Sequence, residues 1–260
     1  MKIKLYCLVL GCLTSLFATA QNVEKVSDPV EWINPLMGTD SKFSLSNGNT
    51  YPTIALPWGM NFWAPQTGKM GDGWIYTYDA DKIRGFKQTH QPSPWMNDYG
   101  QFSIMPLTKH FNLTEDGRAS WFSHKAETVK PYYYSVYLAD YNVTTEITPT
   151  ERSAQFRFTF PKSDSAFIVI DALDKGSYIK ILPNEKKIIG YSTKYARGPL
   201  PNFKNYFVIY IDKPFTVTQT YRDTLLTDSL ELHADHALAV IGFKTTDAEK
   251  VHLRVASSFI

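Results

Sequence analysis

Hydrophobic and polar residues alternate with a period of two along much of the chain, which is the pattern of strands that bury one face. The clearest case is 155–160, where a phenylalanine stands at every second position until Pro161 interrupts the run. No window keeps apolar residues at the 3.6-residue spacing of an amphipathic helix. Alternation predicts strands at 132–138 and 155–160, and further candidate strands, separated by turn residues, are 166–170, 187–191, 206–211, 215–221, 237–243 and 251–256.

Short strands separated by turns rich in Pro, Gly and Asn predict an all-β fold, an antiparallel β-sandwich. The segment 34–101 differs from the rest, because it is dense in Gly, Pro, Trp and Asn and few of its runs are long enough for a strand. Long irregular segments of compact domains usually carry function, so we expect the site there. The last segment, 251–260, reads as a strand with no turn or cap after it, which suggests that the chain is cut short.

The first twenty residues have the pattern of a signal peptide. Lys2 and Lys4 are a short basic region, 5–18 is an apolar run that is short for a membrane span, and 18–20 supplies a small-x-small cleavage pattern. A lipoprotein signal lipidated at Cys12 is the alternative. We therefore expect a signal peptide at 1–20, a sandwich domain at 21–260, and an exported protein, periplasmic or extracellular.

Composition and charge narrow the classes of function. The 260 residues are 43% hydrophobic and 20% charged, which fits a folded domain. Lys and Arg number 27 against 25 Asp and Glu, and cleavage after residue 20 would remove Lys2 and Lys4 and leave 25 of each. A formally neutral protein is poorly suited to bind phosphate backbones, so nucleic acid is not an expected partner. Cys7 and Cys12 would leave with the signal peptide, which excludes a disulfide or a thiolate nucleophile from the mature chain.

Metal, phosphate and nucleophile motifs are missing from the sequence. His233 and His236 are the one closely spaced histidine pair, and their spacing differs from the i, i+4 pair of a zinc helix. There is no phosphate-binding glycine loop and no G-x-S-x-G motif. The sequence therefore predicts no metal ligand in this chain.

Two stretches, 71–76 and 90–100, combine aromatic rings with carboxylate and amide groups. A sugar has apolar C–H faces that an exposed Trp ring can cover, and hydroxyls that carboxylates and amides bind. Trp95 follows two prolines that restrict the backbone, so we predict it as a sugar platform. Further predicted substrate-binding residues are Trp74, His90, Asn97 and Asp98. The alternative is structural: Trp rings in the core, Asp98 capping a turn and His90 in a buried hydrogen bond.

At these residues the sequence resembles the N-terminal part of glycoside hydrolase family 92, the calcium-dependent exo-acting α-mannosidases. The matching pieces, in chain order, are 33–39, 48–52, 57–60, 83–86, 89–90, 98–100, 105–106, 122–127, 133–136, 150–152 and 160–161. Each piece is short, but the ordered set covers essentially all of the mature chain. One departure lies at 91–97, which is bulky and proline-rich where many members have a small Gly/Ser-rich loop, and this leaves the linkage specificity open.

The resemblance implies a two-domain design, with a galactose-mutarotase-like supersandwich followed by an (α/α)6 barrel that is absent from this chain. It implies an inverting mechanism on a mannose-containing oligosaccharide, with the acid, the base and most ligands of a calcium ion in that second domain. By the same resemblance, Phe203 would reach the pocket from another loop. No catalytic residue is therefore expected in this chain.

Three functions compete at this point. The chain is the N-terminal domain of a secreted α-mannosidase active in N-glycan degradation, a free-standing carbohydrate-binding module, or a structural sandwich without a ligand. An in-frame continuation of the gene past codon 260 would favour the first, and a stop codon there would favour the second.

Overall fold

The computed structural model describes residues 28–40, 50–69, 75–90, 93, 97–195 and 200–259. The chain divides into two compact units, Met1–Trp32 and Ile33–Ile260. In the first unit the described residues form a short 3₁₀ helix, η2 (Pro29–Trp32). Among all the described residues, no helix is both long and apolar enough to cross a membrane. The predicted signal peptide at 1–20 lies outside these ranges and stays a prediction.

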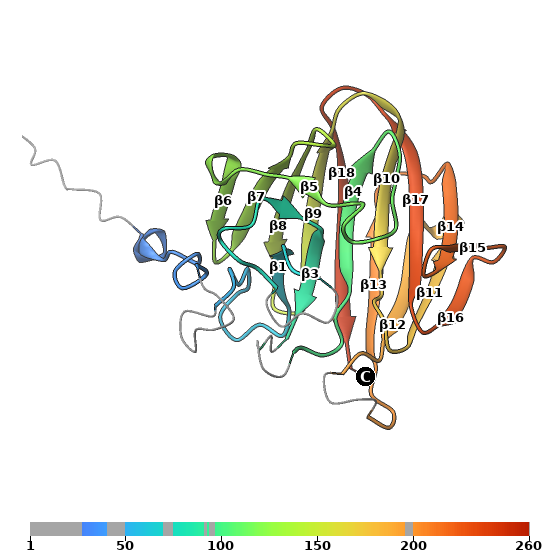
Figure 1. Ribbon diagram of the computed structural model, residues 1–260, viewed down its shortest axis with the longest axis horizontal. Helices are drawn as coiled ribbons and strands as arrows, with labels where there is room; N and C mark the ends of the chain where they lie inside the picture. Colours follow the sequence, from blue (N-terminus) through green and yellow to red (C-terminus); the bar gives the residue numbers. More distant parts are fainter. Residues whose placement is uncertain are drawn as a thin grey trace, which may run out of the picture. The chain divides into compact units, whose positions relative to one another are not determined.

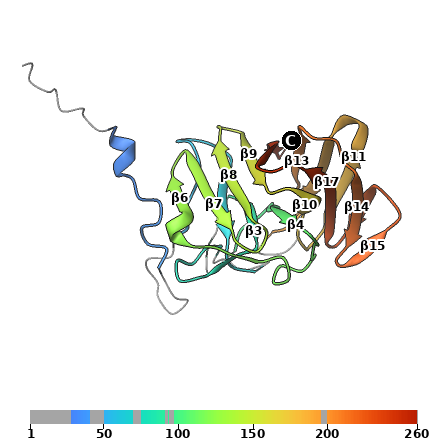
Figure 2. The ribbon, with the colours of Figure 1, turned by 90° about the horizontal axis from the view of Figure 1, so that it is seen from above.

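The second unit contains two large antiparallel sheets (Figures 1 and 2). In spatial order, the seven-stranded sheet consists of β1 (Phe62–Gln66), β3 (Gly85–Thr89), β4 (Ser103–Thr108), β10 (Ser163–Asp171), β17 (Ala237–Thr245), β14 (Val217–Arg222) and β15 (Leu225–Thr227). The nine-stranded sheet consists of β16 (Glu231–Ala234), β11 (Ser177–Leu182), β12 (Lys187–Ser192), β13 (Asn205–Ile211), β18 (Glu249–Ser258), β9 (Ser153–Phe160), β8 (Val143–Pro149), β7 (Tyr133–Leu138) and β6 (Glu127–Lys130). Smaller elements are the pair β2 (Lys82–Ile83) and β5 (Ser120–Trp121) and the 3₁₀ helices η3 (His124–Ala126) and η4 (Pro183–Glu185).

Alternating side chains place the hydrophobic core between the two sheets. In β9 the three phenylalanines of 155–160 are buried, whereas Gln155 is exposed on the other face. Trp63 of β1 packs edge-on against Phe156, with ring centroids 4.8 Å apart, and so joins the seven-stranded sheet to the nine-stranded one. Phe102 stacks on Phe207 in the same layer at 4.4 Å. Aromatic rings thus supply much of the contact across the sandwich.

The structure confirms the all-β antiparallel sandwich and each of the eight strands that the sequence predicted. The segment 34–101 is more regular than we expected, because β1, β2 and β3 lie within it. All five residues of β3 are buried, so this strand has no exposed face and shows no polar alternation. It also lies in the segment rich in Gly, Pro, Trp and Asn, where few strands were expected.

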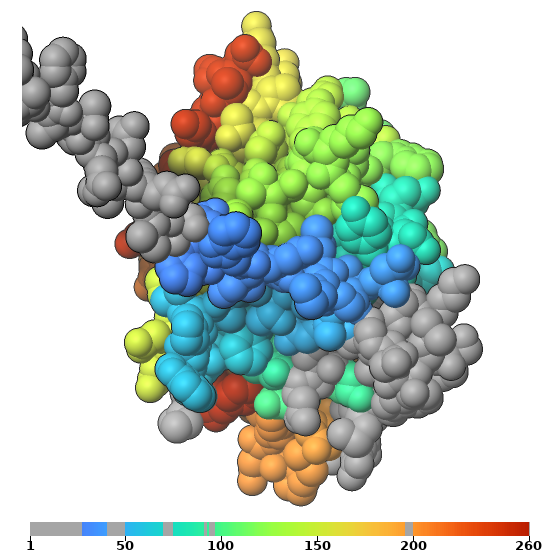
Figure 3. Space-filling model, turned by 90° about the vertical axis from the view of Figure 1, so that its left-hand side faces the viewer, coloured from blue at the N-terminus to red at the C-terminus, as the bar shows by residue number. Residues whose placement is uncertain are grey.

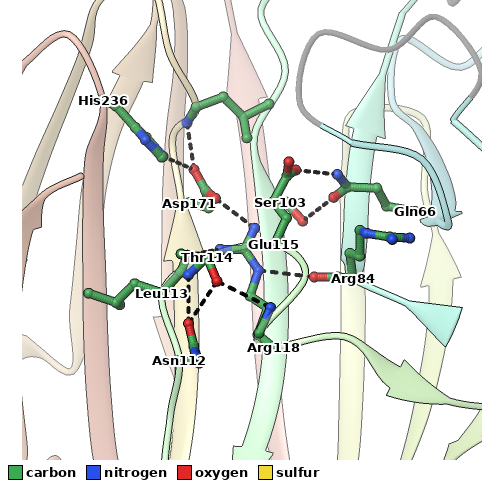
Figure 4. Close-up of polar contacts among 12 residues, drawn as sticks. Gln66, Arg84, Ser103, Asn112, Leu113, Thr114, Glu115, Arg118, Asp171 and His236 are labelled. Carbon is green, nitrogen blue, oxygen red and sulfur yellow. Dashed lines mark hydrogen bonds and ion pairs between the residues drawn. The ribbon is translucent and has the colours of Figure 1, made fainter. Parts of the chain in front are cut away.

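A buried polar network covers the outer face of the seven-stranded sheet (Figure 4). The Arg118 guanidinium donates to the Asp171 carboxylate at 2.6 Å, and to the carbonyl oxygens of Arg84 and Leu113 at 3.0 and 2.9 Å. His236 contacts the other Asp171 oxygen at 2.8 Å. The side chains of Arg118 and Asp171 are 0% and 1% exposed. An ion pair that is fully buried needs this many partners to offset its lost hydration.

Candidate functional site

Several segments distant in sequence meet at one end of the sandwich, near the C-terminus marked in Figure 1. His90 follows directly on the end of β3, and the chain returns through 97–102 into β4. Asn205 begins β13, and β18 pairs with β13 there through Tyr206 and Ser258. Because antiparallel strands alternate in direction, these strand ends gather the β3–β4 loop, the β12–β13 loop and the end of β18.

Asp98 holds the β3–β4 loop together. Its carboxylate accepts hydrogen bonds from the backbone N–H of His90 at 3.0 Å and of Tyr99 at 2.8 Å. It also accepts a hydrogen bond from the Gln101 amide at 2.9 Å. The side chain is buried, and these donors surround it. Its visible role is therefore to fix the loop that carries His90 and Tyr99.

The His90 ring has a defined tautomer. Its Nδ1 lies 2.7 Å from the carbonyl oxygen of Tyr99, which can only accept, so Nδ1 carries the proton and Nε2 has a free lone pair. Burial lowers the pKa of His90, and this outweighs the opposing effects of the Asp98 carboxylate and the Tyr99 carbonyl. His90 therefore presents a neutral hydrogen-bond acceptor at physiological pH.

His90 is one of five rings that pack together. The other four are Tyr99, Tyr195, Phe203 and Phe259, and we refer to the five as the ring cluster. His90 stacks on Tyr99 with centroids 5.0 Å apart and an interplanar angle of 17°. Phe259 meets His90 edge-on at 5.1 Å, and Phe203 meets Tyr99 at 5.9 Å. Phe259 is 37% exposed, so the cluster reaches the surface. Rings in this arrangement form an amphipathic surface with an apolar body and polar edges.

An amide network supports the ring cluster by joining the loop that carries Tyr99 to β13. The Asn205 side chain donates to the Gln88 side-chain oxygen at 3.0 Å and to the Gly100 carbonyl at 2.5 Å. Gln88 in turn donates to Asn61 at 2.8 Å and to Ser257 at 2.6 Å. Gly100 has a φ of 59°, and a Cβ atom there would lie 2.7 Å from Asn205 Cβ. Only glycine allows this loop to approach β13 so closely.

Several buried polar atoms near the site make no hydrogen bond to the protein. Within the described ranges they include His90 Nε2, Asn97 Oδ1 and Asn205 Oδ1, and the Lys87 ammonium on the outer face of β3, beside Ser103, is unpaired as well. Burial lowers the pKa of Lys87 to about 8. Buried polar groups are rarely left unpaired, and such groups concentrate where a protein binds something else. The unpaired atoms of His90, Asn97 and Asn205 mark this end of the sandwich as the candidate site.

The structure brings together four of the six residues that the sequence nominated. His90, Asn97 and Asp98 share one loop, and Phe203 joins them from the β12–β13 loop. Trp74 and Trp95 lie outside the described residues, so their placement stays a prediction. Sequence reasoning missed the rings of Tyr99, Tyr195 and Phe259, and the amides of Gln88, Asn61 and Asn205. The aromatic residues of those segments could have drawn attention to them, but the sequence does not show which strands pair and so which rings meet.

The carboxylates of the described residues do not form a metal site. No three His, Cys, Asp or Glu side chains in the described ranges converge as metal ligands. At the candidate site Asp98 accepts hydrogen bonds from chain donors, and in the outer network Arg118 and His236 occupy Asp171. These groups therefore do not fit a calcium ion, which needs several free oxygen ligands.

Comparison with known proteins finds similar domains. The model of the "Glycosyl hydrolase family 92 N-terminal domain" matches residues 32–258. The family GH92 inverting mannosidase BT2199 of Bacteroides thetaiotaomicron VPI-5482 is 45% identical, with a TM-score of 0.84 over 89% of this chain and 31% of that chain. The family GH92 α-mannosidase BT3965 of Bacteroides thetaiotaomicron is 30% identical, with a TM-score of 0.78 over 89% and 33%.

A third solved structure, the GH92 family glycosyl hydrolase ccman5, has the same fold at 22% identity and a TM-score of 0.73, over 89% of this chain and 32% of that chain. No curated protein matches the sequence. The chain thus spans about a third of the length of these solved relatives.

Proposed function

The chain belongs to glycosyl hydrolase family 92, whose N-terminal domain it contains, and we propose that it is the carbohydrate-contacting domain of an exo-acting α-mannosidase. The observation that carries the proposal is His90, whose neutral Nε2 lone pair is held in place by the Tyr99 carbonyl and has no partner of its own in the described chain. A sugar hydroxyl is a donor of the right kind for that acceptor.

The surroundings of His90 support a mannose-containing ligand. The ring cluster offers apolar surface for the C–H face of a sugar, and the unpartnered Asn97 and Asn205 oxygens are further hydroxyl acceptors. Trp95, predicted from its position after two prolines, would add a platform from the same loop. Asp98 acts on the sugar only through the loop that it fixes, which makes it a positioning residue.

Hydrolysis requires groups beyond this domain. An inverting glycosidase needs an acid and a base carboxyl separated by about 6.5–9.5 Å, with water between them. The one carboxylate described at the candidate site, Asp98, is occupied by chain donors. We therefore assign the acid, the base and the calcium ligands to an (α/α)6 domain outside this chain. Export to the periplasm or beyond, led by the predicted signal peptide, belongs to the same proposal.

A hybrid enzyme tests the proposal. Residues 32–258 of this chain would replace the matching third of BT2199 mannosidase, and the hybrid would be assayed on α-mannobioses with calcium present. We expect mannosidase activity from the hybrid and none from the 260-residue chain alone. Turnover by the chain alone would show that the acid and base lie within it, and an inactive but folded hybrid would contradict the proposed role.

Two substitutions at one position separate the binding role of His90 from its structural role. His90→Asn keeps a donor near the Nδ1 position and removes the acceptor at Nε2, whereas His90→Gln keeps an acceptor near Nε2. We expect His90→Asn to lower kcat/KM of the hybrid roughly tenfold or more, the effect of losing one hydrogen bond of about 1.5 kcal/mol. His90→Gln should retain more activity. His252→Asn is the control, because His252 is a surface histidine paired with Asp212, and it should leave kcat/KM unchanged.

A free-standing carbohydrate-binding module is the second candidate, and the half-exposed ring cluster favours it. It predicts that the 260-residue chain binds α-mannobiose by itself. Calorimetric titration of the chain alone measures this directly, because the mannosidase proposal expects strong binding only when the second domain completes the pocket.

A further inference from the structure

Trp58 stands at the tip of a tight turn that is fixed at its base. The backbone N–H of Gly59 donates to the Leu56 carbonyl at 3.0 Å and closes the turn. Met60 N–H donates to the Glu151 carbonyl at 2.8 Å, which fastens the turn to the β8–β9 connection. The next segment enters the core, where Trp63 is fully buried. A turn anchored in this way presents its tip rigidly.

The backbone conformation of Trp58 is unusual for its residue type. Its φ is 63°, in the left-handed region that favours glycine or asparagine. Pro57 before it and the closing Gly59–Leu56 hydrogen bond match a type II turn, in which the third position normally carries Gly or Asn. A bulky side chain at that position is strained and gains nothing from the turn itself.

The indole gains nothing from the rest of the domain either. Trp58 is 99% exposed, and Met60 beside it is 58% exposed. The neighbouring segment 33–40, tied to residue 50 through a hydrogen bond from Thr50 N–H to the Gly38 carbonyl, exposes Met37 to 76%. Figure 3 shows the face on which 33–40 and 50–60 lie next to each other. Exposed apolar side chains on two adjacent segments are what an interaction surface presents.

The turn also lies at the end of the sandwich that carries the candidate site. Phe62 at the start of β1 pairs with Thr89 at the end of β3, so the turn before β1 and His90 after β3 are at the same sheet end. A partner that covers the Trp58 turn would therefore also border the ring cluster. The solved relatives contain a region that could be this partner, since this chain covers only 31–33% of their length.

We infer that Trp58 is an anchor residue that inserts into an apolar pocket on the remaining two thirds of the family 92 protein. This inference rests on the proposed function, because it requires that second part. The rigid turn presents the indole already in place, so docking costs little side-chain ordering. Trp is the residue type that most often dominates such contacts. A second copy of this chain at Trp58 is the other outcome that the test distinguishes.

The test compares Trp58→Gly in the 260-residue chain and in the hybrid with BT2199. Glycine relieves the left-handed strain, so the 260-residue chain should melt at the same or a higher temperature. The hybrid should lose its buried anchor, and the half-life of its native state at a fixed high temperature, followed by circular dichroism, should fall roughly tenfold or more. Trp58→Asn, which also tolerates the conformation, should behave in the same way.

Trp121→Ala is the control, because Trp121 is a half-exposed Trp on β5 with Lys82 over its ring, and it should affect the two proteins equally. A hybrid half-life that does not change with Trp58 overturns the inference, as does a 260-residue chain that is itself destabilised by glycine. Loss of self-association on substitution, measured by light scattering, would identify a second copy instead and would also overturn it. Mannosidase activity of the unsubstituted hybrid bears on the proposed function alone, so the two failures are distinguishable.

Discussion

Asp171→Asn is the substitution for which the structure gives the sharpest expectation. Asn has the shape of Asp and can still accept one hydrogen bond, but it removes the negative charge that faces the buried Arg118 guanidinium at 2.6 Å. Arg118 stays charged in proteins, and its remaining partners are the neutral carbonyls of Arg84 and Leu113. Removing one partner of a buried pair costs about 3–5 kcal/mol, because the other charge is left without compensation. For a domain of this size that corresponds to a fall of about 6–20 °C in melting temperature.

The same substitution should change the dependence of stability on pH. Burial lowers the pKa of His236, but the Asp171 and Asp223 carboxylates outweigh burial and raise it above its ordinary value. A raised histidine pKa stabilises the fold fully below about pH 6.5, and this contribution disappears as the pH rises through the folded-state pKa. The gap in melting temperature between wild type and Asp171→Asn should therefore be larger at about pH 5.5 than at about pH 8.

At acid pH the protonation of Asp171 itself makes stability depend on pH in the opposite direction. Burial raises its pKa, but Arg118 and His236 outweigh burial and hold the pKa well below its usual range. The carboxylate then contributes stability above about pH 4, and this contribution is lost as the pH falls further. Wild type should approach the variant in stability only in strong acid.

Thermal unfolding of the 260-residue chain, followed by circular dichroism at about pH 5.5, at about pH 8 and in strong acid, measures all of this. Asp164→Asn is the matched control, since Asp164 pairs with Lys244 on the surface at 3.3 Å and both side chains are largely exposed. It should leave the melting temperature unchanged. A melting temperature for Asp171→Asn within about 3 °C of wild type, or a gap that is equal at both pH values, would refute the reasoning.

Three further substitutions test other parts of the structure. Gly100→Ala should destabilise the chain by about 1–2 kcal/mol from its φ alone, with a further loss from the Asn205 contact, and an unchanged melting temperature would show that the loop moves freely. Lys87→Met should raise stability at pH 7, because the fully buried ammonium has a pKa of about 8, and the gain should shrink as pH rises above 8; a destabilised variant would indicate a partner for Lys87. Trp95→Ala in the hybrid should lower kcat/KM, which corresponds to a rise of about 1–3 kcal/mol in the activation free energy. A steep fall in melting temperature with unchanged kinetics would instead place Trp95 in the core.

The sequence predicted eight of the strands, because a period of two and an apolar run between turn residues are local properties of the chain. The run 155–160 became β9, and 206–211 became most of β13. It did not predict β3, which lies in the segment rich in Gly, Pro, Trp and Asn and, being covered on both faces, shows no polar alternation. The family could also be recognised from the sequence, because short motifs in a fixed order can be matched without knowledge of their contacts.

The tertiary structure alone decided how the candidate site is assembled. His90 and Asn97 are close in sequence, but Phe203 and Phe259 reach them only because β12, β13 and β18 pair in one register. The tautomer of His90 depends on the Tyr99 carbonyl, which only the folded loop places beside it. Strand pairing joins residues more than a hundred positions apart, and no local pattern records which strands are neighbours. The sequence by itself therefore determined many of the strands, the fold class and the family, whereas long-range pairing decided which side chains meet and which, like Trp58, stay exposed.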